Sequence, residues 1–243
     1  MMTTSRGRIG ITCRSHHPVF SVVADRLASR GFDVAFLDPE HRIVVEDVSD
    51  LSLLVTKSTR PATVRALMDA ERHGVPTWNS ATGVMVCASR LCVLCALEHV
   101  GFRVPAVYPT RPETGEYVAK SHYHWGDPPN LNGNGDIYEE LLPIDPIDYK
   151  YYVVHDGVEY RTVTVRATSK LFGSKHVVGT TEPVQEHVDG IQRLMARLGM
   201  RAIGVDFVSV DEDYYAVDVN PCPSFKQTGL ETALVDSIVS SIQ

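Results

Sequence analysis

The chain has 243 residues, of which 44% are hydrophobic and 22% are charged, the balance of a soluble globular protein. Its formal net charge of −7 argues against a nucleic-acid partner, because such binding depends on many lysines and arginines. No apolar run reaches the roughly 20 residues that span a bilayer, and the polar start of the chain does not resemble a signal peptide. We therefore expect a cytoplasmic protein that acts on neither membranes nor nucleic acids.

The first third of the chain alternates short apolar runs with segments of helical periodicity. This alternation is typical of a parallel sheet with helices on its faces, and it predicts a small α/β domain over residues 1–80. The expected elements are strands at 8–13, 33–37, 51–56 and 76–78, and helices at 18–30 and 62–73.

The rest of the chain, residues 81–243, predicts a second unit that is mainly antiparallel. Asp156-Gly157 and the acidic segment 211–213 each lie between two strand patterns and predict hairpin turns. The fold class is therefore α+β. The expected elements are helices at 84–100, 186–198 and 231–242, and strands at 117–120, 137–142, 149–154, 160–167, 202–210 and 214–219.

Three oxygen-bearing side chains interrupt the apolar pattern of the last hairpin. Asp218 and Asn220 are two residues apart on one strand, so they project from the same face. The turn brings Asp206, on the partner strand, roughly opposite Asp218. Carboxylate and amide oxygens of this kind suit Mg²⁺, whereas the alternative is a pair of solvated hairpin acids.

Lys120 ends a strand just before a loop rich in glycine and asparagine, where its ammonium group can meet phosphates. Taken alone this is a weak signal, because a lysine at the end of a strand is usually just solvated. The order of the parts along the chain adds a resemblance to the ATP-grasp superfamily. The matching stretches are GFRVP (101–105), YVAK (117–120), YEELL (138–142), DYKYYVV (148–154), YRTVTVRA (160–167) and GVDFV…VDVNP (204–221).

The resemblance implies an ATP-grasp fold, with residues 105–145 as a shortened antiparallel lid over the nucleotide and a C-terminal antiparallel sheet beneath it. It implies ATP and Mg²⁺ as cofactors, with two metal ions held by Asp206, Asp218 and Asn220 and Mn²⁺ as an alternative metal. The backbone atoms of Glu140 and Leu142 would contact the edge of the adenine ring. The nucleotide-binding residues that it implies are Lys120, Glu139, Glu140, Leu141, Leu142 and Asp148.

The sequence departs from the superfamily pattern in its lysines. Most relatives carry a second phosphate-contacting lysine before the Lys120 position, but no lysine lies between Lys57 and Lys120. Arg90 or Arg103 would have to substitute for it.

Two activities fit the resemblance. The ending DVNPCPSFK (218–226) is similar to that of inositol-phosphate kinases, so our first expectation is phosphoryl transfer from Mg-ATP to a small anionic acceptor. The alternative is a carboxylate–amine ligase of the ribosomal-protein-glutamate-ligase type, which acts through an acyl phosphate. A nucleotide-binding module without catalytic activity is a third alternative.

Basic residues are expected to hold the acceptor in an otherwise acidic protein. Arg166, Lys150 and Arg161 are the expected catalytic residues, and Arg14, His16, His17, Ser224 and Lys226 are the expected acceptor-binding residues. Lys170, Lys175 and His176 either join this pocket or form a solvated loop. We expect a monomer or a homodimer.

Overall fold

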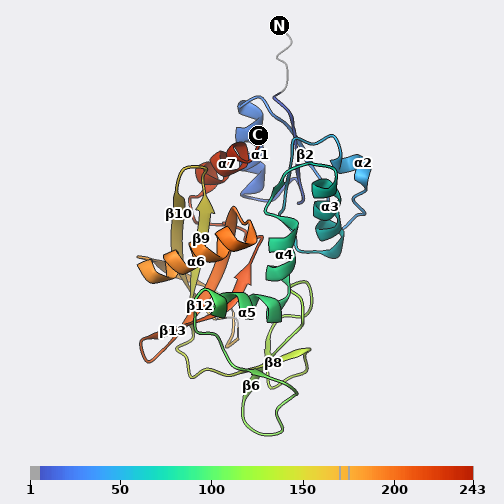
Figure 1. The fold of residues 1–243 in the computed structure, drawn as a ribbon. Coiled ribbons are helices and arrows are strands. Elements are labelled where there is room, and N and C mark those ends of the chain that lie inside the picture. The colour runs from blue at the N-terminus through green and yellow to red at the C-terminus, as the bar shows by residue number, and fades with distance from the viewer. Residues whose placement is uncertain (1–5, 170, 175, 243) are drawn as a thin grey trace.

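The computed structural model describes residues 6–169, 171–174 and 176–242, and this part of the chain forms three sheets (Figure 1). A parallel α/β unit lies at one end of the molecule and a small lid sheet at the other, with a five-stranded sheet between them. This arrangement confirms the predicted fold class, including the antiparallel lid and the C-terminal antiparallel sheet.

The N-terminal unit is a parallel sheet in the order β2-β1-β3-β4. Pro61 stands at the first turn of α3, where the missing amide hydrogen costs no helical bond. The elements are β1 (Arg8–Ile11), α1 (Phe20–Ser29), β2 (Asp33–Phe36), α2 (Val45–Val48), β3 (Leu53–Val55), α3 (Pro61–Arg72) and β4 (Thr77–Trp78).

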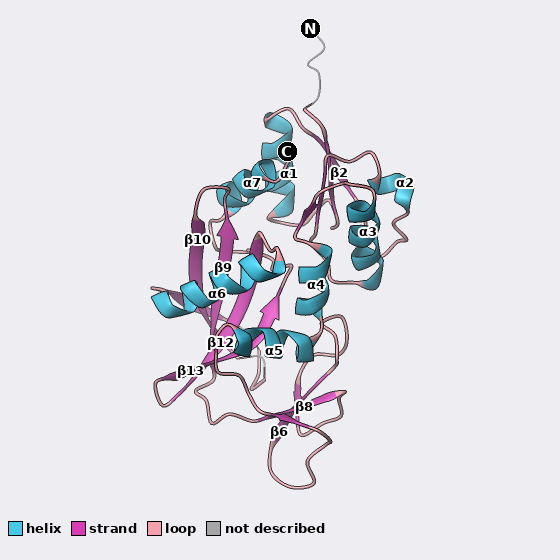
Figure 2. Cartoon of the chain, viewed as in Figure 1, coloured by secondary structure: helices cyan, strands magenta, loops and turns pink. Residues whose placement is uncertain are grey.

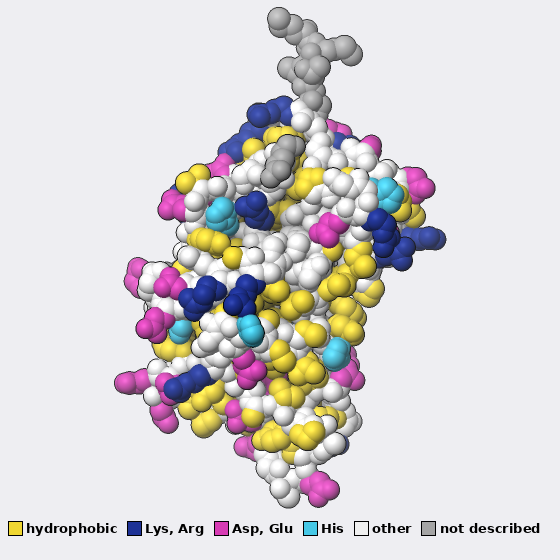
Figure 3. Space-filling model, in the orientation of Figure 1, with side chains coloured by type: hydrophobic (Ala, Val, Ile, Leu, Met, Phe, Trp, Pro, Cys, Tyr) yellow, Lys and Arg dark blue, Asp and Glu magenta, His cyan; other side chains and the backbone are white. Residues whose placement is uncertain are grey.

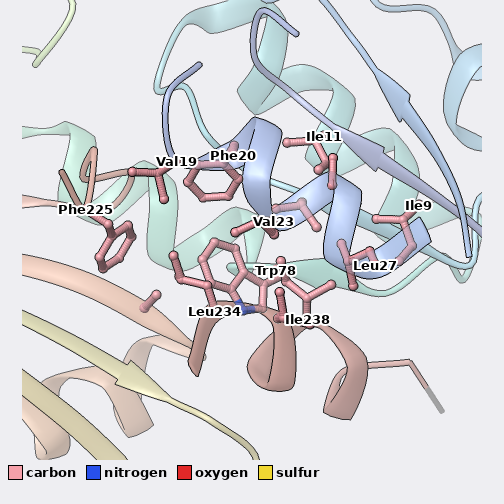
Figure 4. Close-up of a cluster of buried hydrophobic side chains, with 14 of the residues drawn as sticks. Ile9, Ile11, Val19, Phe20, Val23, Leu27, Trp78, Phe225, Leu234 and Ile238 are labelled. Carbon is pink, nitrogen blue, oxygen red and sulfur yellow. The ribbon is translucent and has the colours of Figure 1, made fainter. Parts of the chain in front are cut away.

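The core of this unit is completed by the other end of the chain. Helix α7 (Glu231–Ser240) packs beside α1, and its Leu234 and Ile238 lie in the same buried cluster as Phe20 and Trp78 (Figure 4). The Trp78 indole nitrogen also donates to the hydroxyl of Ser237 over 2.9 Å. One hydrophobic core therefore crosses the boundary expected at residue 80, whereas a second core lies wholly after it, and the boundary itself stays a prediction.

The central sheet is antiparallel, in the order β11-β10-β9-β12-β13. Along β9 and β12, alternate residues such as Tyr151 and Val205 pack under helices α5 and α6, which leaves the residues between them on the opposite face. Figure 2 shows α6 crossing this sheet. The elements are β9 (Ile147–His155), β10 (Tyr160–Thr168), β11 (Val177–Thr181), α6 (Gln185–Leu198), β12 (Ala202–Val210) and β13 (Asp213–Asn220).

The helix expected over 84–100 is two helices, α4 (Ala81–Ala88) and α5 (Arg90–His99). Ser89 between them has an extended backbone, and its hydroxyl accepts from the amide of Cys92 at the start of α5. Ser89 also pairs with Tyr123 of the lid. The hydrophobic periodicity continues through this break, which is why the sequence predicts a single helix.

The lid sheet is antiparallel, in the order β5-β8-β6-β7. Backbone hydrogen bonds from Arg90 to His122 and from His124 to Ala88 attach it to the break between α4 and α5. Its strands are β5 (Val107–Tyr108), β6 (Tyr117–Lys120), β7 (Asn130–Leu131) and β8 (Ile137–Glu140).

Asn79 joins the N-terminal unit to the central sheet. Its buried amide group donates to the carbonyls of Ala202 and Pro221 and accepts from the amides of Arg201 and Ala202, over 2.6–3.0 Å. All four bonds of one side chain therefore link the end of β4 to β12 and to the segment after β13.

The face in Figure 3 carries a hydrophobic area over α4 and α5, where the Met85 and Leu91 side chains are exposed. No helix of the described residues combines the length and the apolar character needed to cross a membrane.

Candidate functional site

A cavity of about 1020 Å³ lies between the lid sheet and the face of the central sheet that the helices leave open. We call it the large cavity. Because side chains alternate along a strand, Asp148 and Lys150 of β9 and Asp206 of β12 point into it, whereas Tyr151 and Val205 point away. It is also lined by the predicted nucleotide-binding residues Lys120, Glu139, Glu140, Leu141, Leu142 and Asp148.

Two of the predicted metal ligands are direct neighbours across the last hairpin. Asp206 of β12 pairs with Asp218 of β13, and a bulge follows because Phe207 pairs with Ala216 rather than with Val217. Asn220 lines the cavity two residues further along β13, and its side-chain oxygen accepts from the amide of Cys222 over 2.8 Å. The hairpin therefore brings together the three oxygen donors that the sequence predicted.

Positive side chains balance both carboxylates. Lys150 is hydrogen bonded to Asp206 and lies 3.4 Å from Asp148. Arg90 donates to Asp218 over 3.0 Å, and the His124 ring nitrogen lies 3.3 Å from the same oxygen. Burial raises the pKa of Asp218, but His124, Arg90 and Lys120 outweigh it and hold that pKa below its usual value.

The donor set fits a hard divalent cation. Two carboxylates and one amide oxygen are the ligands that Mg²⁺ prefers, and it shares its remaining positions with phosphates and water. Burial raises the pKa of Asp206, and the neighbouring Asp218 raises it further, so a second positive charge between the two carboxylates would be favourable.

Lys120 is buried at the end of β6, between the lid and the central sheet. Its ammonium group lies 2.6 Å from the carboxylate of Glu139 and donates to the carbonyl of Val217 over 3.0 Å. The other carboxylate oxygen of Glu139 and the Nε atom of Arg90 are buried without a hydrogen-bond partner among the described residues. Both residues line the large cavity, where a polar ligand would satisfy these atoms.

Some backbone groups of the expected adenine-binding segment, Glu139 to Leu142, already form hydrogen bonds within the chain. The amide of Glu140 donates to the carbonyl of Ala106, and the carbonyl of Leu142 accepts from Ile144, each over 2.9 Å. Contact of these two residues with an adenine edge stays a prediction.

A second cavity, of about 580 Å³, opens beside the first between the N-terminal unit, the lid and the end of β13. We call it the small cavity. Arg14, His16 and His17, three of the predicted acceptor-binding residues, lie in its wall. The fourth, Ser224, lines the large cavity instead. The residues that line both cavities are Lys57, His124, Asn220 and Cys222.

Three predicted residues are not brought to either cavity. Arg166 pairs with Tyr149, whose side chain lies on the helix-covered face of the sheet. Because Lys150 is the next residue after Tyr149, its side chain lies on the opposite face, which lines the large cavity. Arg161 is exposed at the tip of the β9–β10 hairpin, where it is paired with Asp156 and Glu159. Lys226 is exposed and lines neither cavity, although its charge lowers the pKa of Lys57 and His17. Lys170 and Lys175 lie outside the described residues.

The structure distinguishes between the two arginines offered for the missing lysine. Arg90 is buried in the large cavity, whereas Arg103 is exposed and paired with Asp213. The extended backbone at Ser89 directs Arg90 to this position, because α5 begins there with a new helix axis.

Sequence reasoning missed three residues of the two cavities. No role was predicted from the sequence for His124 or Trp125, yet His124 is nearly buried against Asp218 and Trp125 lines the small cavity. Lys57 follows β3, at the carboxyl edge of a parallel sheet where ligands commonly bind. That position was the one signal available for Lys57.

No protein-family model and no curated protein matches the chain. Solved structures do match it over nearly its whole length. The ATP-grasp ligase PsnB, in complex with a phosphomimetic variant of its minimal precursor, Mg and ADP, has a TM-score of 0.70 at 15% identity and covers 99% of this chain and 100% of its own. A RimK domain ATP-grasp protein from Sphaerobacter thermophilus has a TM-score of 0.72 at 14% identity, covering 97% of this chain and 99% of its own.

The ADP complex of PurK, N5-carboxyaminoimidazole ribonucleotide synthetase, has a TM-score of 0.75 at 14% identity and covers 100% of this chain and 78% of its own. All three structures are similar to this chain in fold at low identity. Their likeness agrees with the three sheets described above. The chain has the ATP-grasp fold.

Proposed function

We propose that the chain is an ATP-dependent carboxylate–amine ligase that activates its acceptor as an acyl phosphate. The observation that carries the proposal is the large cavity, which combines an acidic hairpin of Asp206, Asp218 and Asn220 with the cations Lys120 and Arg90. Acidic groups and cations facing one another across one cavity suit a metal–triphosphate complex.

The chemistry has two steps. An oxygen of the acceptor carboxylate attacks the γ-phosphorus of ATP, the bond from that phosphorus to the β–γ bridging oxygen breaks, and ADP leaves. An amine then attacks the acyl carbon, phosphate leaves with the electron pair of the C–O bond, and the proton lost by the amine ends on that phosphate. No oxidant and no covalent enzyme intermediate is required.

The side chains of the cavity supply positioning and charge. Lys120 and Arg90 would hold phosphate oxygens from the lid side, and the Glu139 to Leu142 segment would line the base. Asp206, Asp218 and Asn220 would hold Mg²⁺, which when bound neutralises charge that develops on the transferred phosphoryl group. In this nucleotide-bound arrangement Arg90 and Lys150 exchange their carboxylate contacts for contacts to phosphate.

The kinase expectation rested on the DVNPCPSFK ending and on basic residues around Arg166. The comparisons give no support to a resemblance to inositol-phosphate kinases, because the similar structures described above include the ligase PsnB and the synthetase PurK and no such kinase. Arg166 and Arg161 also lie away from both cavities, which removes two of the cations that were to hold a phosphorylated acceptor. The ligase, first considered as the alternative, is therefore the better-supported function.

The test measures Mg²⁺-dependent release of ADP in the presence of hydroxylamine. One pool of acceptors contains amino acids and dicarboxylates, and the other contains polyols and inositol phosphates. Hydroxamate formed from the first pool would reveal an acyl phosphate and support the ligase. Turnover of the second pool without hydroxamate would establish a kinase, and binding of ATP without ADP release in either pool would favour a non-catalytic module.

A further inference from the structure

Lys57 differs from the other cations that line the large cavity. Arg90, Lys120 and Lys150 each contact a carboxylate, whereas Lys57 takes part in no ion pair among the described residues. Its ammonium group donates to the carbonyl of Cys222 over 2.7 Å and lies 5.9 Å from the centre of the Phe20 ring. Burial lowers the pKa of this ammonium group. A partly buried cation without a counter-ion is unfavourable, and an anionic ligand would stabilise it.

The backbone holds Lys57 firmly in this position. Its amide donates to the Thr12 hydroxyl over 2.9 Å, and the Thr12 amide in turn donates to the carbonyl of Val55 over 3.0 Å. These bonds join the segments that follow β1 and β3 at the carboxyl edge of the parallel sheet. These bonds hold the backbone of Lys57 between the two segments, and the carbonyl of Cys222 holds its ammonium group.

The Lys57 side chain lies at the boundary between the two cavities. Lys57 lines both of them, as does Asn220, the last of the predicted metal ligands. A group bound by Lys57 from the small cavity would therefore lie next to the acidic hairpin. At an exposed part of the small cavity wall, Glu40 bridges Arg14 and Arg60 over 2.5 and 3.3 Å, and these guanidinium groups keep further donors for a second anionic group.

We propose that the small cavity binds the acceptor, a small molecule with two carboxylates, and that Lys57 holds the reacting carboxylate at the junction of the two cavities. Its second carboxylate lies toward Arg14 and Arg60, and Trp125 of the lid covers it. The volume of about 580 Å³ is that of a small-molecule site. The proposal rests on the proposed ligase function, because it presumes that the large cavity holds the nucleotide.

The experiment titrates the full chain with three probes of similar length, in the presence and absence of Mg-AMPPNP. Glutarate carries two carboxylates, butyrate carries one, and 1,5-pentanediol carries none. Binding is followed by tryptophan fluorescence, since the chain has two tryptophans and Trp78 is buried in the core whereas Trp125 lines the small cavity. A Trp125→Phe variant identifies the part of the signal that comes from the cavity.

We expect glutarate to bind the wild type more tightly than butyrate, and pentanediol not to bind. Lys57→Met should weaken glutarate binding by about tenfold or more and leave the Kd of Mg-AMPPNP unchanged, because truncation removes one partner of a charged hydrogen bond. Lys57→Arg should recover part of the lost affinity. Arg197→Met, which removes one positive charge from an exposed position on α6, should behave as wild type.

Three results would overturn the proposal. Unchanged glutarate affinity in Lys57→Met would remove Lys57 from the site, and failure of all three probes to bind the wild type would exclude the dicarboxylate class. A parallel loss of Mg-AMPPNP affinity in Lys57→Met would assign Lys57 to the nucleotide. If the wild type itself fails to bind Mg-AMPPNP, the proposed function is wrong, and the glutarate titrations without nucleotide still decide the role of Lys57.

Discussion

Arg90 donates to Oδ1 of Asp218 over 3.0 Å, although the two residues are 128 positions apart in the sequence. The contact joins the start of α5 to the last strand of the central sheet, at the carboxylate predicted to bind metal. It places an arginine where the ATP-grasp resemblance leads us to expect a lysine. We make four predictions, which concern Arg90, Asp218, Asn79 and His17.

Arg90→Met should weaken the binding of ATP by about 10- to 100-fold, because a hydrogen bond to a charged group contributes about 1.5–3 kcal/mol. Isothermal titration with Mg-AMPPNP measures the effect. Arg103→Met is the comparison, since Arg103 is exposed and paired with Asp213 outside both cavities. Equal affinities of the two variants would show that Arg90 does not contact the nucleotide.

Asp218→Asn should reduce Mg²⁺-dependent ADP release by about 100-fold or more, because a lost metal ligand removes several kcal/mol of charge stabilisation. The rate is measured against Mg²⁺ concentration, where a weaker site would also show a higher half-saturation point. Asp213→Asn, at the exposed start of the same strand, should keep the wild-type rate. Full activity of Asp218→Asn would remove this carboxylate from the metal site.

The next prediction concerns Asn79, whose four hydrogen bonds are buried. Asn79→Ala should lower the free energy of unfolding by about 4 kcal/mol, since each of the four bonds contributes roughly 1 kcal/mol and the backbone groups of Arg201, Ala202 and Pro221 lose their partner. For a chain of this size the fall in Tm is about 8–16 °C. Asn134→Ala, on the exposed lid, serves as the control. A Tm within one or two degrees of wild type would contradict the prediction.

His17 should make the free energy of unfolding depend on pH. Burial, and then the charges of Lys57 and Lys226, lower its pKa from 6.5 to about 4, and its Nδ1 accepts from the amides of Val19 and Phe20 at the start of α1. Between pH 6.5 and about 4, His17 is therefore mostly protonated in the unfolded chain and mostly neutral in the folded chain. The stabilisation is complete above pH 6.5 and is lost as the pH falls through this window.

Urea unfolding of wild type and His17→Gln at pH 7.5 and pH 5 measures this dependence. The wild type should lose more stability between the two values than the variant, because glutamine cannot be protonated. If wild type and His17→Gln lost the same stability between pH 7.5 and pH 5, the His17 ring would have the same pKa in the folded and the unfolded chain.

Much of the fold was predictable because it follows from local pattern. The alternation of strands and helices up to Trp78 predicted the parallel sheet, and the spacing of Asp218 and Asn220 with the turn after Val210 predicted the acidic pair across the hairpin. These features depend on residues that are close in sequence.

The features that were missed depend on contacts between distant segments. The break at Ser89 is stabilised by pairing with Tyr123 of the lid, which no helical periodicity can reveal. Arg166 has the right residue type on the right strand, but its position in the strand directs it to the wrong face. The Lys57 ammonium group is held at the boundary of the two cavities by the carbonyl of Cys222, 165 residues further along the chain.

The attachment of the N-terminal unit by Asn79, by α7 and by a shared core has a further consequence for how substrates enter. We expect the N-terminal unit and the central sheet to move together, because separating them would expose Trp78 and break the Asn79 bonds. If the proposed function is correct, opening and closing of the site would then come from the lid sheet. Because His124 belongs to the lid and lines both cavities, a single movement would admit or enclose both reactants together.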